Sequence, residues 1–376
     1  MSVHPAGGPG GRGQARGGRA PGAGNAARAS APGAVGRVRR VTVVIDLPAA
    51  ITRRATSGPQ DGLVVGVDAG GTKTLAAALD LATGAVTTGR SGPANPDAIG
   101  LDDAVAAITE AVGEATGDRE DVRAVLVAGA GTDAATLGEA VVRALPSAVF
   151  VNDVVAAWAA VAAGEPAIAV ISGTGSNALG VDGEHRARRA GGWGHVFGDE
   201  GSGHWLGREA VGAAIRAYDG RDAPTLLGTL LCEETGAASA ADAVIGLYAD
   251  GAGKTRVAAL APIVSRAAAQ GDAAATALLA RGGEALADHV VAIADALELG
   301  ADAVLPIGLT GSTWKAGGAL TARFAEVVAQ RLPGAEIRRV QTPPVVGSLA
   351  LALHACERSD AIEALLPDAA AALADA

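Results

Sequence analysis

Residues 63–74 read LVVGVDAGGTKT, and LAAALD follows at residues 75–80. An apolar run, a glycine-rich turn and a second apolar run predict two strands joined by a tight connection. Gly70 and Gly71 allow the backbone to turn sharply, so that successive N–H groups can converge on phosphate oxygens. The stretch therefore predicts a strand–turn–strand unit that can hold a phosphate, although a plain hairpin would use the same letters.

Three side chains beside this turn carry further chemistry. Thr72 offers a hydroxyl and Lys73 an ammonium. Asp68, at the end of the first strand, could order the waters of a Mg2+ ion, because that ion keeps much of its hydration shell and binds few carboxylates. The turn is thus a candidate site for phosphate and magnesium together.

The segments that follow alternate between strand and helix patterns, which predicts an α/β fold. The short apolar runs at 124–128 and 148–151 predict buried parallel strands, and residues 154–163 predict a helix after the second of them. Another amphipathic helix is predicted by apolar residues at intervals of four, three and four, namely Leu101, Val105, Ile108 and Val112.

A second strand, glycine turn and strand occur at residues 167–182, which read AIAVI, SGTGSN and ALGVD. This repetition in kind predicts two similar lobes. We place the N-terminal lobe at residues 61–164 and the C-terminal lobe at 165–344, and we allow the C-terminal helix at 345–376 to return to the first lobe.

The middle of the second lobe, residues 208–299, is expected to be mostly helical. Asp272 is well placed to cap a helix that begins at Ala273. The later elements that we predict are strands at 303–307 and 336–340, a helix opened by Pro343 and Pro344, and an Ala-rich helix after Pro367.

The composition is that of a folded protein with an acidic body. The chain has 376 residues, of which 49% are hydrophobic and 19% charged, with a formal net charge of -10; this is enough for two domains with a sizeable core. Residues 1–60 hold nine arginines and one acidic residue, Asp46, and are rich in Gly, Ala and Pro. We expect them to form a disordered basic tail. The acidic remainder disfavours nucleic acid and anionic membranes as partners.

The two cysteines, Cys232 and Cys356, have no second Cys or His at ligand spacing. A disulfide framework, a zinc site and an iron–sulfur site are therefore not supported, and a reducing cytoplasm fits. The most apolar early stretch is interrupted by Asp46 and Pro48 and is too short to span a bilayer. We expect a cytoplasmic protein without a signal peptide or a transmembrane helix.

Asn152 and Asp153 stand where a predicted strand gives way to a helix. Ligands bind at this edge of α/β sheets, and a carboxylate there can accept the proton of an attacking hydroxyl. Taken alone, Asp153 fits a helix cap better than a catalytic role. Its position, 21 residues before Thr174 in the second glycine turn, favours the catalytic interpretation.

Two further segments predict ligand contacts, in addition to the hydroxyls and the amide of the second glycine turn. Residues 191–203 read GGWGHVFGDEGSG and combine six glycines with a Trp, a His and two acids. Ordering so many glycines merely to connect two elements would be costly, so a binding loop is favoured. Residues 311–315, GSTWK, follow a strand and open a helix, whose N–H groups could face a nucleotide or could simply be capped.

Two motifs are set aside. GAGKT at 251–255 resembles a Walker loop, but Tyr248 stands where its first glycine is required and no buried strand precedes it. It is interpreted as a helix entry. His185 and the arginines at 186, 188 and 189 are interpreted as a solvated basic turn that could attract an anionic substrate.

Five segments in this order resemble the N-acetylglucosamine kinase branch of the BadF/BadG/BcrA/BcrD ATPase-like family: VGVDAGGTKT, FVNDVVAA, ISGTGSNALGV, GGWGHVFGDEGSGHWLGREA and LTGSTWKAGGAL. The resemblance covers nearly all of residues 63–355. It implies two ribonuclease-H-like lobes of the actin/hexokinase-like class with ATP and sugar in a cleft between them. It also implies phosphorylation of the 6-hydroxyl of N-acetylglucosamine or a related aminosugar, with ATP and Mg2+ as cofactors, and a possible homodimer.

The same resemblance implies roles for individual residues. Asp153 would be the base that takes the proton of the sugar 6-hydroxyl, and Asp68 would hold Mg2+ through water. ATP would be bound by Gly70, Gly71, Thr72, Lys73, Thr174, Gly311, Ser312 and Ala316. The aminosugar would be bound by Asn95, Asp153, Ser176, Asn177, Gly192, Trp193 and Asp199.

Other functions within this fold are weighed against the same residues. ATPase activators of radical dehydratases need clustered cysteines, and repressor-related sugar kinases use a Cys-rich zinc motif; the sequence has neither. A sugar-sensing regulator would carry a DNA-binding helical module ahead of the lobes, which the Gly/Pro-rich tail does not offer. A kinase of another hexose or aminosugar, such as glucosamine, N-acetylmannosamine or a muramic-acid derivative, stays open, as does an ATPase without a sugar substrate.

Overall fold

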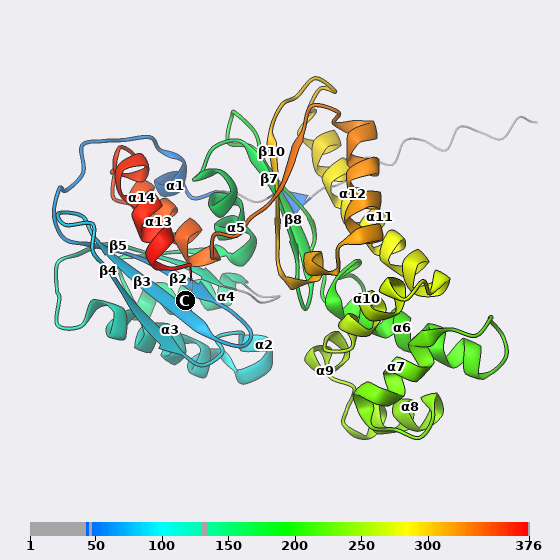
Figure 1. Ribbon diagram of the computed structural model, residues 1–376. Helices are drawn as coiled ribbons and strands as arrows, with labels where there is room; N and C mark the ends of the chain where they lie inside the picture. The colour runs from blue at the N-terminus through cyan, green and yellow to red at the C-terminus, as the bar shows by residue number, and fades with distance from the viewer. Residues whose placement is uncertain (1–42, 45–46, 130–133, 375–376) are drawn as a thin grey trace, which may run out of the picture. The chain divides into compact units, whose positions relative to one another are not determined.

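In the computed structural model, which describes residues 43–44, 47–129 and 134–374, the strands form two sheets (Figure 1). The first has the order β4-β3-β2-β5-β6 and the second the order β1-β9-β8-β7-β10-β11. The strands are β1 (Val43–Val44), β2 (Leu63–Ala69), β3 (Thr74–Asp80), β4 (Val86–Ser91), β5 (Val122–Gly129), β6 (Ala148–Asn152), β7 (Ala167–Ser172), β8 (Ser176–Val181), β9 (Ala187–Gly191), β10 (Pro306–Thr310) and β11 (Glu336–Arg339).

The helices lie on the faces of these sheets and in a separate group within the second half of the chain (Figure 1). They are α1 (Ala49–Thr52), α2 (Pro96–Ile99), α3 (Leu101–Thr116), α4 (Ala134–Ala144), α5 (Asp153–Ala162), α6 (Gly203–Tyr218), α7 (Leu226–Thr235), α8 (Ala240–Ala249), α9 (Lys254–Ala258), α10 (Ala261–Ala269), α11 (Ala273–Ala296), the 3-10 helix η1 (Ser312–Ala316), α12 (Gly318–Arg331), α13 (Pro344–Ala355) and α14 (Ala361–Ala372). No helix of the described residues has the length and apolarity that crossing a membrane requires.

The first sheet follows the sequence prediction closely. β2 pairs antiparallel with β3 and parallel with β5, and β5 pairs parallel with β6. Helix α3 packs on β2, β3 and β4, and α13 packs on β2 and β5. The predicted amphipathic helix is confirmed, but its buried face is centred on Ala104, Ile108 and Ala111, whereas Leu101 and Val105 are partly exposed.

The second sheet repeats the pairing of the first. β7 is antiparallel to β8 and parallel to β10, just as β2 is antiparallel to β3 and parallel to β5. β10 is in turn parallel to β11, as β5 is to β6. The predicted repeat of strand, glycine turn and strand is therefore confirmed. Because β2 and β7 are equivalent strands, the two glycine turns lie at equivalent sheet edges.

Two predicted strands differ in detail. The strand expected at 303–307 begins only at Pro306. Proline is tolerated as the first residue of a strand, where its missing N–H is not needed for pairing. The strand expected to be buried at 148–151 is an edge strand of its sheet. Val149 and Phe150 are partly accessible there, since β6 pairs on one side only within the described residues.

Small residues let helices α5 and α13 pack closely against each other. Gly347 of α13 lies against the Ala156 carbonyl of α5. Ser348 donates a hydrogen bond of 3.0 Å to the Val67 carbonyl of β2, so α13 is fixed to the strand that leads to the first glycine turn. In the helical region, Asp272 caps α11 as predicted, accepting from Ala275 N at 2.8 Å.

The segment before residue 61 is more ordered than expected. β1 pairs antiparallel with β9, α1 packs on α13, and Ile51 is fully buried. The Arg54 guanidinium donates to the Gly164 carbonyl at 2.6 Å. The expected tail, 1–60, is therefore too long, because its last apolar residues cover α13; residues 1–42 lie outside the described part of the chain.

The last helix also starts earlier than expected. α14 begins at Ala361, so Pro367 lies inside the helix and does not precede it. Pro367 is exposed, and water can therefore solvate the carbonyl that lacks a partner because proline has no N–H.

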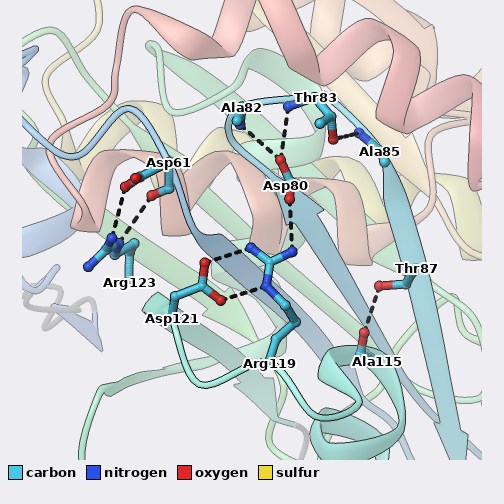
Figure 2. A network of polar contacts seen from close by, with 10 residues as sticks. All are labelled: Asp61, Asp80, Ala82, Thr83, Ala85, Thr87, Ala115, Arg119, Asp121 and Arg123. Atoms are coloured by element: carbon cyan, nitrogen blue, oxygen red, sulfur yellow. Dashed lines mark hydrogen bonds and ion pairs between the residues drawn. The ribbon is translucent and has the colours of Figure 1, made fainter.

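An ionic network stabilises the first sheet at the end opposite to its glycine turn (Figure 2). The Arg119 guanidinium donates to both carboxylate oxygens of Asp121 at 2.6 Å and to Asp80 at 3.0 Å, and Arg123 pairs with Asp61 at 2.8 Å. The hydrogen bonds from Arg119 lower the pKa of Asp121 to about 2. All five charged residues have partners within the network, so it is structural.

Candidate active site

The strand register aligns the ends of β2, β5 and β6 at one edge of the first sheet. Ala69 is opposite Gly129, and Gly129 is opposite Asn152. Asp68, the residue before the last one of β2, therefore lies at the same edge at which Asp153 follows β6. Carboxyl ends of parallel strands are the usual ligand-binding edge of α/β sheets.

Asn152 takes the capping role that the sequence left open for Asp153. Its side-chain oxygen accepts a hydrogen bond of 3.3 Å from Val154 N, which makes it the N-cap of α5. Asp153 is the first residue of the helix, and its side chain is half-buried. The carboxylate is thus available for another function.

Both carboxylates at this edge have a pKa raised towards neutral pH. Burial raises the pKa of Asp153 to about 6, the charge of Asp68 adds to this effect, and Val154 N–H, Arg189 and Lys254 oppose it. Burial likewise raises the pKa of Asp68 to about 6, against the charge of Lys73. Carboxylates shifted in this way are typical of proton-transfer and cation-binding sites.

Backbone hydrogen bonds fix the first glycine turn, and space remains beside Gly71. Gly70 N donates to the Lys73 carbonyl at 3.1 Å, and Ala94 N donates to the Gly70 carbonyl at 2.9 Å. The second bond fixes the segment that contains Asn95 beside the turn. A side chain added at Gly71 would meet no atom within 4 Å, and the side chains of Thr72 and Lys73 are exposed. The turn therefore leaves room for a ligand.

The second glycine turn is held by the predicted binding loop, residues 191–203. Gly203 N donates to the Gly173 carbonyl at 2.7 Å, and His204 N donates to the Thr174 carbonyl at 3.2 Å. Ser176 Oγ donates to the Glu200 carbonyl at 2.8 Å. Loop and turn thus form one unit, which brings together the candidate residues that the sequence placed on each.

Asp199 and Asn177 lie in the interior of this unit. Asp199 is buried, accepts a hydrogen bond from Ser176 N at 3.2 Å, and pairs with Lys254 Nζ at 2.8 Å. Asn177 Oδ1 is buried and has no hydrogen-bond partner among the described residues. A Cβ at Gly192 would approach the Asn177 amide to 2.9 Å. Because buried polar atoms are normally satisfied, Asn177 Oδ1 is a candidate acceptor for a ligand.

Trp193 and Arg189 lie beside this pocket. The Arg189 guanidinium stacks over the Trp193 ring at 5.4 Å, and 60% of the Trp193 surface is exposed. Arg189 Nε is buried and lacks a hydrogen-bond partner within the described part of the chain. The basic turn expected here is partly wrong, because Arg188 and Arg189 belong to strand β9, whose outer neighbour is β1.

A cavity of about 580 Å³ adjoins the second glycine turn. Its lining includes three predicted nucleotide contacts, Thr174, Ser312 and Ala316. Thr313 Oγ1 donates to the Gly173 carbonyl at 3.1 Å and ties η1 to the turn. Gly311, which has a φ of 102°, packs against the Ser172 carbonyl and admits no side chain. This volume falls in the range of small-molecule sites.

Several lining residues were missed by sequence reasoning. Thr255, Ser265 and Arg266 of α9 and α10 line the same cavity, and Lys254 pairs with Asp199. GAGKT is a helix entry, as predicted, since α9 begins at Lys254. A Lys–Thr pair is typical of phosphate-binding loops, but the motif does not predict one here, because Tyr248 stands in place of its first glycine and no strand precedes it.

A larger hollow of about 900 Å³ lies elsewhere, along β6 and α4. Its lining is mainly apolar and includes Val142, Val149 and Phe150. Size does not make it the candidate site, because its lining contains none of the predicted nucleotide contacts, whereas the smaller cavity is lined by Thr174, Ser312 and Ala316.

The candidate residues therefore form two groups. One surrounds the first glycine turn with Asp68, Asn95 and Asp153, and the other surrounds the second turn with the sugar and nucleotide candidates. The charges of Arg189 and Lys254 act on Asp153 and link the two groups. The described residues contain no cluster of three or more metal-binding side chains. Asp68 nevertheless suits Mg2+, which is commonly held by one or two carboxylates together with phosphates.

Comparison with known proteins identifies relatives of this arrangement. The sequence pattern of the BadF/BadG/BcrA/BcrD ATPase family matches residues 65–352. The chain is 30% identical over 246 residues to an N-acetylmuramic acid/N-acetylglucosamine kinase of Clostridium acetobutylicum, which covers 63% of this chain and 80% of the relative. It is 27% identical to an N-acetyl-D-glucosamine kinase of Dictyostelium discoideum, over 78% of this chain and 98% of the relative.

A solved structure shares the fold. It is that of a candidate N-acetylglucosamine kinase from Chromobacterium violaceum, with a TM-score of 0.64 and 26% identity over 78% of this chain and all of the other. The predicted α/β fold with two related lobes of the actin/hexokinase-like class is thereby confirmed.

Proposed function

This chain belongs to the BadF/BadG/BcrA/BcrD ATPase family, and on that premise we propose that it phosphorylates the 6-hydroxyl of N-acetylglucosamine or a related aminosugar with ATP. The observation that carries the proposal is Asp153: a half-buried carboxylate with a pKa of about 6, freed from capping by Asn152. The names of the two curated relatives support the sugar class.

The proposed reaction uses Asp153 as the general base. Its carboxylate takes the proton of the 6-hydroxyl, the hydroxyl oxygen bonds to the γ-phosphorus of ATP, and the bond from that phosphorus to the β–γ bridging oxygen breaks. ADP leaves and the proton stays on Asp153. A pKa of about 6 leaves the group ionised at neutral pH and still basic enough to accept a proton.

The phosphates would lie between the two glycine turns. Gly70, Gly71, Thr72 and Lys73 would bind them from the first turn and Thr174 from the second, and the adenosine would occupy the 580 Å³ cavity beside Ser312 and Ala316. Gly311 would shape the entry to that cavity. Asp68 would hold Mg2+ through water, and the ion would neutralise phosphate charge.

The aminosugar would be held by the loop and the second turn. Asn177 Oδ1 is a buried acceptor without a partner in the described residues, and a sugar hydroxyl or acetamido N–H could donate to it. Ser176, Gly192, Trp193 and Asp199 would complete this side, and Asn95 would contact the sugar from the first turn. The exposed Trp193 ring offers an apolar face of the kind on which sugar rings pack.

We also propose lobes at 61–164 and 165–344, with α13 and α14 joined to the first. This division is supported by sheet membership, since β2 to β6 form one sheet and β7 to β11 belong to the other. A homodimer and a cytoplasmic location remain proposals from the resemblance and the cysteine usage. The net charge of -10 favours small-molecule partners over nucleic acid.

An acidic aminosugar is a second candidate substrate. Arg189 Nε is buried without a partner among the described groups, and the charge of Arg189 reaches Asp153. A guanidinium in this position could pair with a carboxylate on the sugar. The relative from Clostridium acetobutylicum is named for both N-acetylmuramic acid and N-acetylglucosamine.

The test is ADP release over a panel of sugars with and without Mg2+. We expect Mg2+-dependent turnover that is strongest with N-acetylglucosamine, and little ADP without sugar. Phosphorus NMR of the product should show a 6-phosphate. Fastest turnover with N-acetylmuramic acid would favour the second candidate, and brisk hydrolysis of ATP without any sugar would refute both.

A further inference from the structure

Lys254 is held by an ion pair whose carboxylate is itself fixed. Lys254 Nζ lies 2.8 Å from Asp199 Oδ2. Asp199 is 4% exposed, and its other oxygen accepts from Ser176 N at 3.2 Å. Lysine is a flexible side chain, and this anchoring defines where its ammonium lies.

The ammonium lies directly over the second glycine turn. A Cβ added at Gly175 would stand 2.9 Å from Lys254 Nζ and 2.9 Å from Asp199 Oδ2. Gly175 therefore lacks a side chain where Lys254 approaches the backbone. The turn that the ammonium covers includes Thr174, one of the residues proposed to bind the phosphates of ATP.

Lys254 is linked to both the nucleotide cavity and the proposed base. Its neighbour Thr255 lines the cavity together with Thr174 and Ser312. The charge of Lys254 also acts on Asp153. The Lys254 side chain is 36% exposed, so a ligand can reach it.

An ammonium in this position has donors to spare. It carries three N–H groups, and the pair with Asp199 needs one of them. The ion pair also neutralises a carboxylate that would otherwise repel phosphate. Compact ammonium groups commonly bind phosphate as point charges.

We propose that Lys254 binds the terminal phosphate of ATP and that Asp199 positions its ammonium. This inference rests on the proposed function for the identity of the nucleotide. It adds a cation from α9 to the phosphate contacts expected at the two glycine turns. The competing explanation is a purely structural ion pair that fastens α9 to the loop at 191–203.

Nucleotide binding without sugar separates these explanations. Calorimetry would compare ADP with the non-hydrolysable β,γ-imido analogue of ATP, for the full chain and for Lys254→Met. We expect the Kd of the analogue to rise about tenfold or more, because a charge-assisted hydrogen bond is lost. The Kd of ADP should change less than about threefold, since ADP lacks the terminal phosphate. An equal loss for both nucleotides, or no loss, would overturn the proposal.

The matched control is Arg256→Met. Arg256 is on the same short helix, is half exposed, and lies 3.9 Å from Asp250 on the surface, so its removal changes the charge of α9 without touching the turn. Both Kd values should stay unchanged. If Lys254→Met does not fold, Lys254→Gln keeps a polar side chain at this position without the charge and must show the same selective loss for the analogue.

Failure of the proposed function would look different. A wild-type protein that binds both nucleotides but phosphorylates no sugar would contradict the kinase proposal. It would leave the contrast between the analogue and ADP at Lys254 intact.

Discussion

Burial, together with the negative charge of Asp68, raises the pKa of Asp153 to about 6. Asp68 is in β2 and Asp153 follows β6, and strand β5 lies between these two strands. The register of β2, β5 and β6 aligns the two carboxyl groups at one sheet edge. The proposed general base and the proposed cation-binding carboxylate are thereby brought to the same sheet edge by strand pairing. This relationship makes Asp153 the first residue to test.

Replacing Asp153 by Asn should lower kcat for sugar phosphorylation about 100-fold or more, because an amide cannot accept the proton. The measurement is ADP release with N-acetylglucosamine. Asp102→Asn is the matched control, since Asp102 is an exposed acid in the first turn of α3, and it should keep nearly full activity. A kcat for Asp153→Asn within about tenfold of wild type would remove Asp153 from the role of base.

The same substitution should stabilise the ligand-free protein at pH 8. The folded state binds the Asp153 proton more tightly than the unfolded chain, with a pKa of about 6 against 3.8. Ionised Asp153 is therefore unfavourable in the folded state above pH 6, and this effect vanishes below about 3.8. Asn carries no charge at any pH.

Thermal unfolding without ligands measures this effect. The Tm of Asp153→Asn should exceed that of wild type at pH 8, and the difference should shrink as the pH falls from about 6 towards 4. A Tm difference that is constant between pH 8 and pH 4 would show that Asp153 is not ionised in an unfavourable environment.

Gly192 should be needed for the shape of the sugar site. Its φ is 73°, and a Cβ there would press on the Asn177 amide. Gly192→Ala should raise the KM for sugar about tenfold, the size expected for one disturbed hydrogen bond, and leave the KM for ATP nearly unchanged. Gly194→Ala is the control: its φ is 80° but its Cβ would meet nothing within 4 Å. Equal effects of both variants would assign the loss to backbone strain alone.

Much of the fold could be predicted from local sequence. The strand–turn–strand units at 63–80 and 167–182, and the Asp272 cap, follow from apolar runs and turn chemistry that act over a few residues. Elements that depend on tertiary partners were harder. β1 and α1 exist because β9 and α13 offer them surfaces, and no local pattern encodes those surfaces.

The site shows the same division. Residue type alone indicated the glycine turns, Asp153 and the loop at 191–203 as candidates. Lys254 and Arg189 lie in the two motifs that the sequence did not assign to the site, GAGKT and the basic turn. The pairing of Lys254 with Asp199 joins residues far apart in the chain, so no local pattern predicts it. The capping role of Asn152 was also undecidable from sequence, since Asn and Asp cap helices equally well.

The close packing of α13 on α5 depends on Gly347. A methyl group there would collide with the Ala156 carbonyl and force the helices apart, so Gly347→Ala should destabilise the protein by about 1–3 kcal/mol. Gly113→Ala is the matched control in α3: the position is exposed with open space around it, and alanine should stabilise by about 0.5–1 kcal/mol. Urea unfolding measures both. Because α13 is hydrogen-bonded to β2 through Ser348, Gly347→Ala should also lower kcat. Changes in the free energy of unfolding that have the same sign in the two variants would contradict this account.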